Sequence, residues 1–526
     1  MSKPQSRIFI CNYMGLTNDY RHTIFFESLE DQENYFMEKV AKTYTDYTYL
    51  RKNWSIKVVA PIEEAETWSY LFFTNTDGTT YGKTYYYFIT DVKYLSDTSV
   101  ELELEMDVMQ TYMFDYNLKQ CFVEREHSAT DEIGDNTVDE GLELGHLINM
   151  SVVEDENLKN NNVILIMSSV DLIAEGYPNV NGSKFGNVYS GCNVYRVPLS
   201  DLVDTDYIKE LVDNMGAKAD GIVTIWSYPE SLLDVDTSGL ILRLVKGGKT
   251  YEFTFNRPTS IDGYTPKNKK LFTYPYNFLY VSNNNGGCAS YRYERFADNA
   301  IEFEVYGAPL PDGGVKTVPK NYNGVGYNHE EALVLTGFPT SPWNADGYKI
   351  WLAQNQHQRA VSQISSAGTM VAGAGMALAG VATANPLLIG SGAGTLVHGA
   401  TSTASLLAQQ KDMEAQPAQS RGTLSATLNS VIDQFTFSYY AKSITAERAK
   451  IIDEYFTLYG YKTNRVKMPN RNVRQSFTYT KTVDCQVSGN LCESDRRKIE
   501  AIYNNGITFW NKSIAVGNYY ASNRPK

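Results

Sequence analysis

The chain has 526 residues, and its 60 acidic and 47 basic side chains give a net charge of -13 at pH 7. This balance excludes sequence-independent binding of nucleic acid by the general surface, because such binding needs an excess of Lys and Arg. The six cysteines are widely spaced and include no C-x-x-C pair, which excludes a zinc knuckle and a disulfide scaffold and favours folding in a reducing cytosol.

The first elements in chain order predict a mainly β protein. Ser28 and Asp31 form a capping box that opens a helix at 29–41. Alternating runs follow at 83–90 and 99–107, with a Ser-Asp turn before the second run. Apolar residues and glutamates alternate in that second run, which is typical of a half-buried strand.

A similar order of strand, polar turn and strand recurs at 291–306, after an aromatic-rich segment at 271–281. We therefore expect two related β-domains in one chain. The alternative is that any two hairpins resemble each other.

Helices are few and lie mainly near the C-terminus. One is predicted at 445–458, because its apolar residues share one face and Gly460 follows as a stop signal. A shorter helix is predicted at 495–503, starting at Ser494 and ending before Gly506.

The sequence motifs for nucleotide binding and for calcium binding are both incomplete. Gly247-Gly-Lys-Thr250 resembles the end of a phosphate-binding loop, but Arg243 occupies the position of the required earlier glycine. We expect a hairpin turn there. The segment that starts at Asp234 opens like a calcium loop, but Val245 stands where the bidentate acidic ligand belongs.

The remaining titratable residues also favour structural roles. His127 follows Arg125 and Glu126, and a lone histidine in such a setting is more often structural than catalytic. The acidic pairs at 131–132 and 139–140 are expected to be solvated. We predict no catalytic residue, no metal site and no cofactor.

The segment 360–410 contains no charged residue, and 352–434 contains no aromatic residue. Its arms at 367–384 and 387–407 flank Asn385-Pro386, a dipeptide that favours a turn, and each is nearly long enough to cross a bilayer as a helix. The arms are rich in Gly and Ala, which insert weakly but allow close packing of helices in lipid. The segment is interpreted as a conditional membrane inserter, and the alternative is an apolar loop that plugs the interior of an oligomer.

Two sets of residues carry this interpretation. The residues expected to contact the membrane are Ala367, Met370, Val371, Met376, Leu378, Val381, Pro386, Leu387, Leu388, Ile389, Leu396 and Val397. The small residues expected to allow close packing are Gly368, Ala372, Gly380, Gly390 and Gly394.

Several blocks of sequence resemble the tail-knob proteins of small short-tailed phages, the Picovirinae-type podoviruses. The resemblance is weak from about 151 to 260. The blocks are Asp107-Val-Met-Gln-Thr-Tyr-Met-Phe-Asp115, Phe122-Val-Glu-Arg-Glu-His127, Asn136-Thr-Val-Asp-Glu-Gly141, Tyr461-Lys-Thr-Asn-Arg-Val-Lys-Met-Pro469, Phe477-Thr-Tyr-Thr-Lys-Thr-Val-Asp-Cys485, Asn505-Gly-Ile-Thr-Phe-Trp510 and Val516-Gly-Asn-Tyr519.

The resemblance implies a fold and an assembly. The fold is mainly β, with two tail-tube-like β-barrel domains per chain, few helices, an inserted middle region and a long Gly/Ala-rich hydrophobic loop. The expected ranges are 1–150 for the first tube-like domain, 151–260 for the middle region, 261–345 with 431–526 for the second tube-like domain, and 346–430 for the loop. The implied assembly is a homo-hexameric ring.

The resemblance also implies a function without catalysis. The hexamer forms a tube at the distal tip of the virion tail, next to a lower collar or proximal tail tube protein. It is assembled in the host cytoplasm. Its loops plug the tube and then penetrate lipids of the host cytoplasmic membrane during infection. Viral double-stranded DNA then passes through the lumen without sequence-specific binding.

An acidic lumen would repel phosphates and keep DNA mobile, and Glu101, Glu103 and Glu105 are candidates for its lining. Two other functions stay open. One is a tail-tip enzyme that degrades cell wall. The other is a receptor-binding tail protein that contacts a wall glycan through tyrosines such as Tyr177, Tyr189 and Tyr195.

Overall fold

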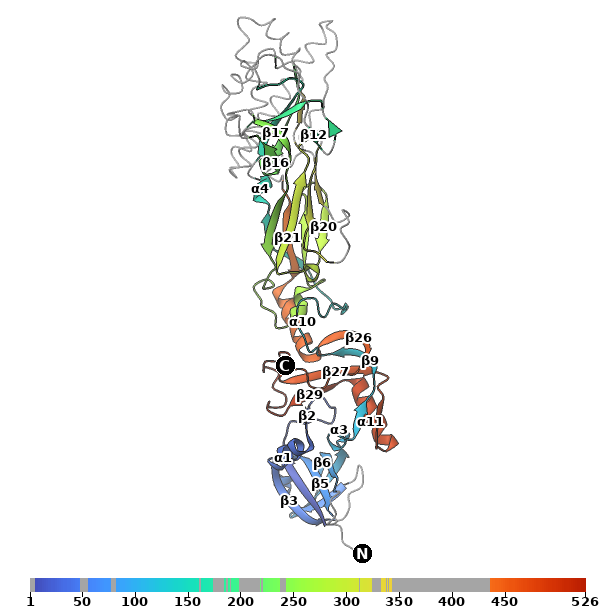
Figure 1. Ribbon diagram of the computed structural model, residues 1–526. Coiled ribbons are helices and arrows are strands. Elements are labelled where there is room, and N and C mark those ends of the chain that lie inside the picture. The colour runs from blue at the N-terminus through green and yellow to red at the C-terminus, as the bar shows by residue number, and fades with distance from the viewer. Residues whose placement is uncertain are drawn as a thin grey trace, which may run out of the picture. The chain divides into compact units, whose positions relative to one another are not determined.

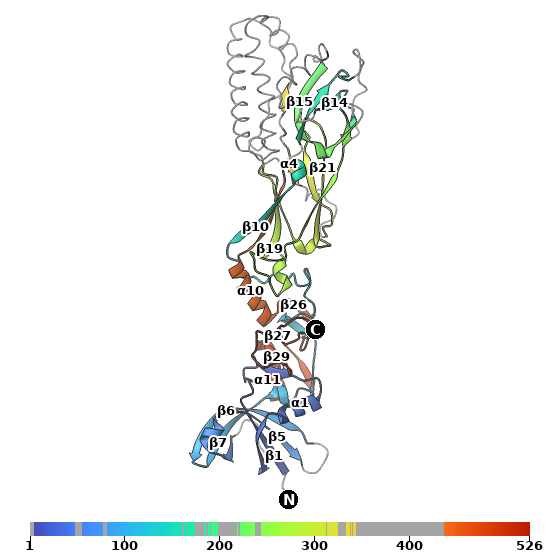
Figure 2. The same ribbon diagram turned by 90° about the vertical axis from the view of Figure 1, so that its left-hand side faces the viewer.

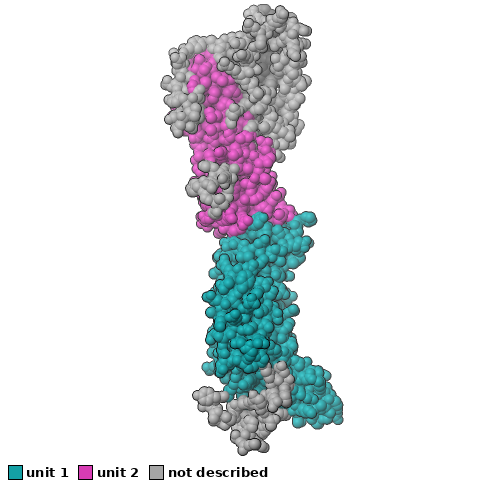
Figure 3. All heavy atoms as spheres, turned by 90° about the vertical axis from the view of Figure 1, so that its right-hand side faces the viewer, with its two compact units in different colours: residues 1–146, 260–276, 444–526 teal, residues 147–259, 277–443 magenta. Residues whose placement is uncertain are grey.

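The computed structural model resolves two compact units, shown in teal and magenta in Figure 3. Unit 1 comprises 1–146, 260–276 and 444–526, and unit 2 comprises 147–259 and 277–443. The structure describes residues 5–47, 55–76, 82–159, 162–173, 184–185, 188–189, 191–197, 218, 221–236, 243–311, 313–323, 333–336, 338, 340–342 and 436–526.

This division differs from the predicted ranges. The expected second tube-like domain combines 261–345 with 431–526, whereas residues 444–526 pack with the N-terminal part of the chain in unit 1. The predicted middle region at 151–260 falls almost wholly in unit 2, together with residues from 277 onwards. The difference arises because strands distant in sequence pair with one another, which strand periodicity does not reveal.

Unit 1 contains a six-stranded antiparallel sheet in the order β3-β1-β5-β6-β7-β4 (Figure 1). Its strands are β1 Gln5–Asn12, β3 Val40–Tyr47, β4 Ser55–Val59, β5 Trp68–Thr76, β6 Thr84–Ser96 and β7 Ser99–Met106. The predicted hairpin is confirmed, because β6 and β7 pair directly and Ser96 lies opposite Ser99. In β7 the even-numbered apolar residues are buried and the odd-numbered residues are half-buried, as the alternation predicts.

A second sheet of unit 1 joins the two ends of the chain. Its order is β2-β29-β27-β9-β26, with β2 parallel to β29 and the other pairs antiparallel. The strands are β2 Thr23–Phe25, β9 Cys121–Glu126, β26 Tyr461–Lys467, β27 Phe477–Val483 and β29 Ile507–Asn511. Two further strands, β8 Tyr116–Leu118 and β28 Val487–Gly489, pair with each other. One hydrophobic core runs from Ile8 to Trp510.

The helices of unit 1 begin and end close to their signals. They are α1 Leu29–Met37, α2 Ile62–Ala65, α3 Val108–Thr111, α10 Ala446–Tyr459 and α11 Glu493–Asn505. The Ser28 hydroxyl caps α1 as predicted, accepting from the Asp31 N–H at 3.1 Å. However, α1 ends at Met37 because Val40 starts β3 and pairs with Cys11.

The two C-terminal helices match their predictions with small shifts. Thr445 caps α10, and Gly460 follows its last residue with φ 65°. The last helix begins two residues earlier than expected, because its N-cap residue is Cys492 and not Ser494.

Unit 2 consists mainly of three antiparallel sheets (Figure 2). One has the order β16-β17-β14-β11-β15-β24, with β11 Asn162–Ser168, β14 Asn193–Val197, β15 Ile222–Pro229, β16 Leu233–Val235, β17 Arg243–Gly248 and β24 Thr340–Pro342. A second has the order β18-β21-β22-β23, with β18 Tyr251–Asn256, β21 Ala300–Gly307, β22 Val315–Pro319 and β23 Leu333–Leu335. The third has the order β10-β25-β19-β20, with β10 Leu147–Glu154, β19 Asn277–Ser282, β20 Cys288–Tyr291 and β25 Ser438–Ile444.

The smaller elements of unit 2 include α4 Glu156–Lys159, short 3-10 helices at Glu230–Leu232 and Tyr293–Arg295, and the two-stranded pair of β12 Lys184–Phe185 with β13 Val188–Tyr189. The second and third sheets share an aromatic core. The ring of Phe303 on β21 lies 5.0 Å from the ring of Tyr439 on β25, and Phe253 on β18 lies 4.9 Å from the same tyrosine. These sheets therefore pack face to face through rings that are far apart in sequence.

Two predicted hairpins are wrong. In the segment 291–306, the expected first strand is a short 3-10 helix at Tyr293–Arg295, and β21 pairs with β18 and β22. The similarity that suggested two related domains therefore does not extend to the pairing of the strands. Likewise, Gly247 and Gly248 do not form a hairpin turn, because β17 and β18 belong to different sheets.

Candidate functional site

The predicted membrane-active residues, from Ala367 to Val397, all lie outside the described residues. Their interpretation therefore stays a prediction. The structure does describe the two places where the chain leaves for this segment and returns from it, at 340–342 and from 436 onwards.

Both ends are fixed in one core of unit 2. Before the segment, Phe338 is buried and its ring lies 5.1 Å from that of Tyr228, and Thr340 pairs with Trp226. After the segment, Phe437 is buried in the same hydrophobic cluster. The apolar segment therefore connects two chain positions, Phe338 and Phe437, that are buried in the same β core.

Hydrogen bonds also hold the chain at Thr436, where the described residues resume after the apolar segment. The Thr436 hydroxyl donates to the Asp155 carbonyl at 3.0 Å, and the Asn284 amide donates to the Thr436 carbonyl at 3.1 Å. Asp155 is itself buried, and its carboxylate accepts from the Tyr251 hydroxyl at 2.6 Å. Burial raises the pKa of Asp155, while the Tyr251 hydroxyl bond opposes the rise.

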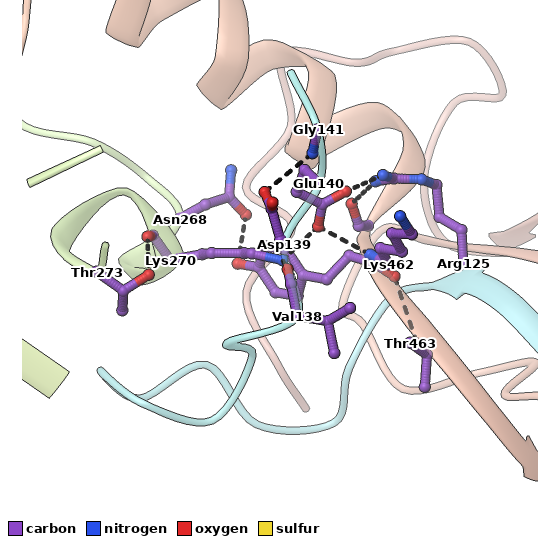
Figure 4. A network of polar contacts seen from close by, with 12 residues as sticks. Arg125, Val138, Asp139, Glu140, Gly141, Asn268, Lys270, Thr273, Lys462 and Thr463 are labelled. Carbon is purple, nitrogen blue, oxygen red and sulfur yellow. Dashed lines mark hydrogen bonds and ion pairs between the residues drawn. The ribbon is translucent and has the colours of Figure 1, made fainter. Parts of the chain in front are cut away.

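A buried ionic network holds unit 1 together (Figure 4). The Glu140 carboxylate pairs with the side chains of Arg125 and Lys270, and it accepts from the Lys462 backbone N–H at 2.9 Å. Lys270 also donates to the Val138 carbonyl at 2.8 Å. Burial lowers the pKa of Lys270, and Glu140 opposes that effect. The prediction that the 139–140 pair is solvated is wrong for Glu140, whose side chain is fully buried.

Arg125 and Asp453 extend the network to α10. The Arg125 guanidinium donates to the Gly460 carbonyl at 2.7 Å and lies 4.7 Å from the centre of the Tyr455 ring. The buried carboxylate of Asp453 accepts from the Tyr264 hydroxyl at 2.7 Å and from the Asn268 backbone N–H at 3.0 Å. These bonds join segments that lie more than a hundred residues apart.

The other acidic pair is also only partly solvated. The Asp131 carboxylate accepts from the Tyr461 hydroxyl at 2.5 Å, and burial raises its pKa. Glu132 is exposed and pairs with Lys269. No local sequence signal distinguishes Glu140 or Asp131 from its solvated neighbour, because only the fold brings their partners to them.

His127 has the structural role that was predicted. Its Nδ1 accepts from the Tyr479 backbone N–H at 2.7 Å, and its Nε2 donates to the Thr457 carbonyl at 3.0 Å. Burial, with Arg474 nearby, lowers the pKa of His127 to about 3. The imidazole is therefore neutral near neutral pH, with both nitrogens bonded to the backbone.

The glutamates proposed for a lumen are partly paired. Glu101 accepts from the Ser55 hydroxyl, Glu103 pairs with Lys93, and Glu105 pairs with Lys498 at 2.8 Å. All three are half-buried on the face of β7 opposite to its core residues. Their direction relative to a lumen stays a prediction.

The Gly247-Gly-Lys-Thr250 segment borders a cavity of about 640 Å³ in unit 2, also lined by Gly307, Lys316 and Thr336. A phosphate-binding loop needs a helix N-terminus whose N–H groups point at the anion. Here the glycines belong to β17 and a strand follows them. The cavity therefore lacks the geometry of that nucleotide site.

Within the described ranges, no group of three or more His, Cys, Asp or Glu side chains is placed to hold a metal ion. The helices among these residues include none long and apolar enough to cross a membrane. Tyr195, proposed for glycan contact, is fully buried, and its hydroxyl donates to Asp171 at 2.9 Å. Its part in that proposal is therefore wrong, while the side chains of Tyr177 and Tyr189 lie outside the described residues.

Two family profiles match the chain. The C-terminal domain of the tail knob protein gp9 of Bacillus phage phi29 matches residues 243–524. The N-terminus of the caudoviral major tail protein matches residues 4–117, which contain the six-stranded sheet.

Curated relatives and a solved structure match over nearly the whole chain. The tail knob protein gp9 of Bacillus phage phi29 is 25% identical, with 96% of each chain covered. The protein of the same name from Bacillus phage B103 is 24% identical, with 99% of each chain covered. The fold is similar to that of the bacteriophage C1 tail knob protein gp12, with a TM-score of 0.67, 15% identity, and coverage of 99% of this chain and 100% of that chain.

Proposed function

The chain belongs to the phage tail-knob protein family, and we propose that it forms a homo-hexameric tube at the distal tip of a short tail. Its relatives are named as structural tail knob proteins, so the chain is a structural component of a virion tail and not an enzyme. The proposed neighbour above the tube is a lower collar or proximal tail tube protein.

The apolar segment gives the tube its second role. Before infection, six copies of 346–430 plug the lumen. During infection the arms at 367–384 and 387–407 leave the lumen and enter the host cytoplasmic membrane. The small residues of the arms let the six copies pack closely in lipid, which compensates for the weak insertion of a single copy.

One observation carries this proposal. An uncharged segment at 360–410 is inserted between two ends that are fixed in a single β core. A fixed base allows the segment to change its environment without unfolding the sheets, because Phe338 and Phe437 keep their core positions.

Viral double-stranded DNA then passes through the tube. A wall with an excess of carboxylates repels phosphates and limits adhesion of the passing DNA. The net charge of -13 supports such a wall, and the glutamates of β7 are its proposed lining.

The proposal is tested by dye release from anionic phospholipid vesicles between pH 4 and 8. We compare the wild-type chain, a chain lacking 360–410, and the full-length variant Leu388→Asp/Ile389→Asp. Wild-type rings should release dye. Both variants should form rings of the same subunit number and release little, because deletion or buried charge removes favourable insertion.

Light scattering after size-exclusion chromatography measures the assembly of every sample. Equal release by the wild-type chain and the deletion variant would rule out the membrane role of the segment. Intact wild-type rings without any release would leave the segment as a plug and assign the membrane step to another tail protein.

A further inference from the structure

An exposed apolar patch crosses three strands of the second sheet of unit 1. Phe122 on β9 lies opposite Val466 on β26 and opposite Val483 on β27. Met468 follows two residues after Val466. All four side chains are exposed, with Val466 at 69% and Met468 at 58%. Contiguous exposed apolar side chains are a common feature of surfaces that bind a partner.

The rim of this patch is basic. The edge strand β26 carries Lys462, Arg465 and Lys467 and no acidic residue. Lys467 is paired with Glu126, and Lys481 on β27 is paired with Glu124 on β9. Arg465 and Lys119 are exposed and lie near Val466 and Phe122 in the sequence, against one exposed carboxylate, Asp484, next to Val483. We call Phe122 and its three apolar neighbours the basic-rimmed patch. In a chain with a charge of -13, this patch fits an acidic surface.

A second exposed apolar patch lies at the end of the first sheet. Ser99 on β7 pairs with Val59 on one side and with Ser96 on the other, next to Tyr94 and Leu95. Val59 is 66% exposed, and Tyr94 and Leu95 are also exposed. We call Val59, Tyr94 and Leu95 the acidic-rimmed patch.

The name reflects the charges around these three residues. The hairpin from 91 to 103 contains four carboxylates and one lysine, and Glu63 and Glu66 lie just beyond β4. Lys57 on β4 is a further exposed lysine, so the carboxylates remain in excess. Two apolar patches of similar kind thus carry rims of opposite charge, and Figures 1 and 2 show their strands in separate parts of unit 1.

We propose that the basic-rimmed patch of one copy docks on the acidic-rimmed patch of a second copy. This inference rests on the proposed hexameric tube and names the surfaces that join its subunits. Rims of opposite charge attract each other, whereas rims of the same charge repel, so a patch does not dock on a second patch of its own kind. Because the two surfaces differ, the contact is heterologous, and repeated heterologous contacts generate a closed ring when the rotation closes.

Two variants of the full chain test the inference. Val466→Asp/Met468→Asp disables the basic-rimmed patch, and Val59→Asp/Leu95→Asp disables the acidic-rimmed patch. Each variant alone should be monomeric by light scattering. An equimolar mixture should give a one-to-one heterodimer and no ring, because only one intact pair of patches remains between the two variants.

Val152→Asp is the matched control, since Val152 is an exposed strand valine in unit 2, and it should assemble like the wild-type chain. Thermal unfolding verifies that each variant is folded. Rings formed by either variant alone, or a mixture that stays monomeric, would overturn the docking surfaces. A monomeric wild-type chain would instead overturn the hexameric tube, and with it this inference.

Discussion

At the residue scale, the least expected feature of unit 1 is its buried charge. Glu140 balances Arg125 and Lys270 where water is excluded, so each charge depends on its partners. Removing one member of such a group is costly, because it leaves the others unpaired at low dielectric constant. Asp139, the neighbour of Glu140, is exposed, so adjacent acidic residues contribute very differently to stability.

The variant Glu140→Gln should lose about 3 kcal/mol or more of unfolding free energy. The amide keeps the shape of the side chain but leaves Arg125 and Lys270 without a counter-charge. Urea denaturation followed by tryptophan fluorescence measures the loss. Glu132→Gln, at an exposed ion pair, should change stability by less than about 1 kcal/mol. Equal effects of the two substitutions would contradict the role of the network.

His127 should make the fold sensitive to acid. Its pKa is about 3 in the folded chain and about 6.5 when unfolded, so the unfolded chain binds more protons between these values. Stability therefore falls as pH decreases from about 6.5 to about 3, with a slope of up to about 1.4 kcal/mol per pH unit from this group.

The measurement for His127 is urea denaturation at several pH values in that window. His127→Gln should flatten the dependence, because the amide does not titrate. His146→Gln, at an exposed histidine, serves as the control and should leave the dependence as in the wild-type chain. An unchanged slope in His127→Gln would show that other groups cause the acid sensitivity.

At the element scale, the helix ends show which local signals decide the structure. Ser28 caps its helix as the sequence indicates, whereas Thr445, expected as the first helical residue, is the N-cap of α10. In both cases a hydroxyl next to the first turn accepts a backbone N–H wherever the helix lies. The early end of α1 is different in kind. It depends on the pairing of Val40 with Cys11, and helix propensity carries no information about that contact.

Gly460, which follows the last residue of α10, can be tested directly by a single substitution. It has φ 65°, and a Cβ there would lie 2.2 Å from the Glu126 carbonyl oxygen. Gly460→Ala should therefore destabilise the chain by more than the roughly 1–2 kcal/mol expected from the positive φ alone. Gly263→Ala is the matched control, because Gly263 has φ 79° and open space around it.

Thermal unfolding of both glycine variants separates the two effects. Gly263→Ala reports the backbone cost, and the additional loss in Gly460→Ala reports the clash. A loss in Gly460→Ala no larger than that in Gly263→Ala would mean that the Glu126 backbone moves aside without cost.

At the scale of the whole molecule, the C-terminal part of the chain completes both units. Strand β25 pairs with β19 in unit 2, and β27 and β29 pair with β9 and β2 in unit 1. Residues from 436 onwards are thus held by sheet pairing and by the buried network, independently of the covalent link through 343–435.

Cleavage within that link should therefore leave the chain assembled. With a protease site introduced between 352 and 434, the two fragments should elute together from a size-exclusion column in native buffer. They should separate in concentrated urea, which breaks the sheet pairing. Separation in native buffer would contradict the view that these ladders hold the parts together.

The sequence by itself determined the β7 alternation, the cap at Ser28, the helix that starts near Thr445, the stop at Gly460 and the unusual composition of 360–410. These features follow from local physics, because neighbouring residues fix the strand period, the first turn of a helix and the solubility of a segment. The blocks near both ends of the chain also indicated the tail-knob family correctly.

Only the tertiary structure decided which strands pair, which acidic residues are buried and where the units divide. Glu140 and Asp139 are equivalent in the sequence, and the strand at 300–307 had an expected partner next to it in the chain. The burial of Glu140 depends on its contact with the distant Lys270, and the position of β21 depends on its pairing with the distant β18. Such contacts leave no periodic trace in a single sequence, because they arise only when the whole chain packs.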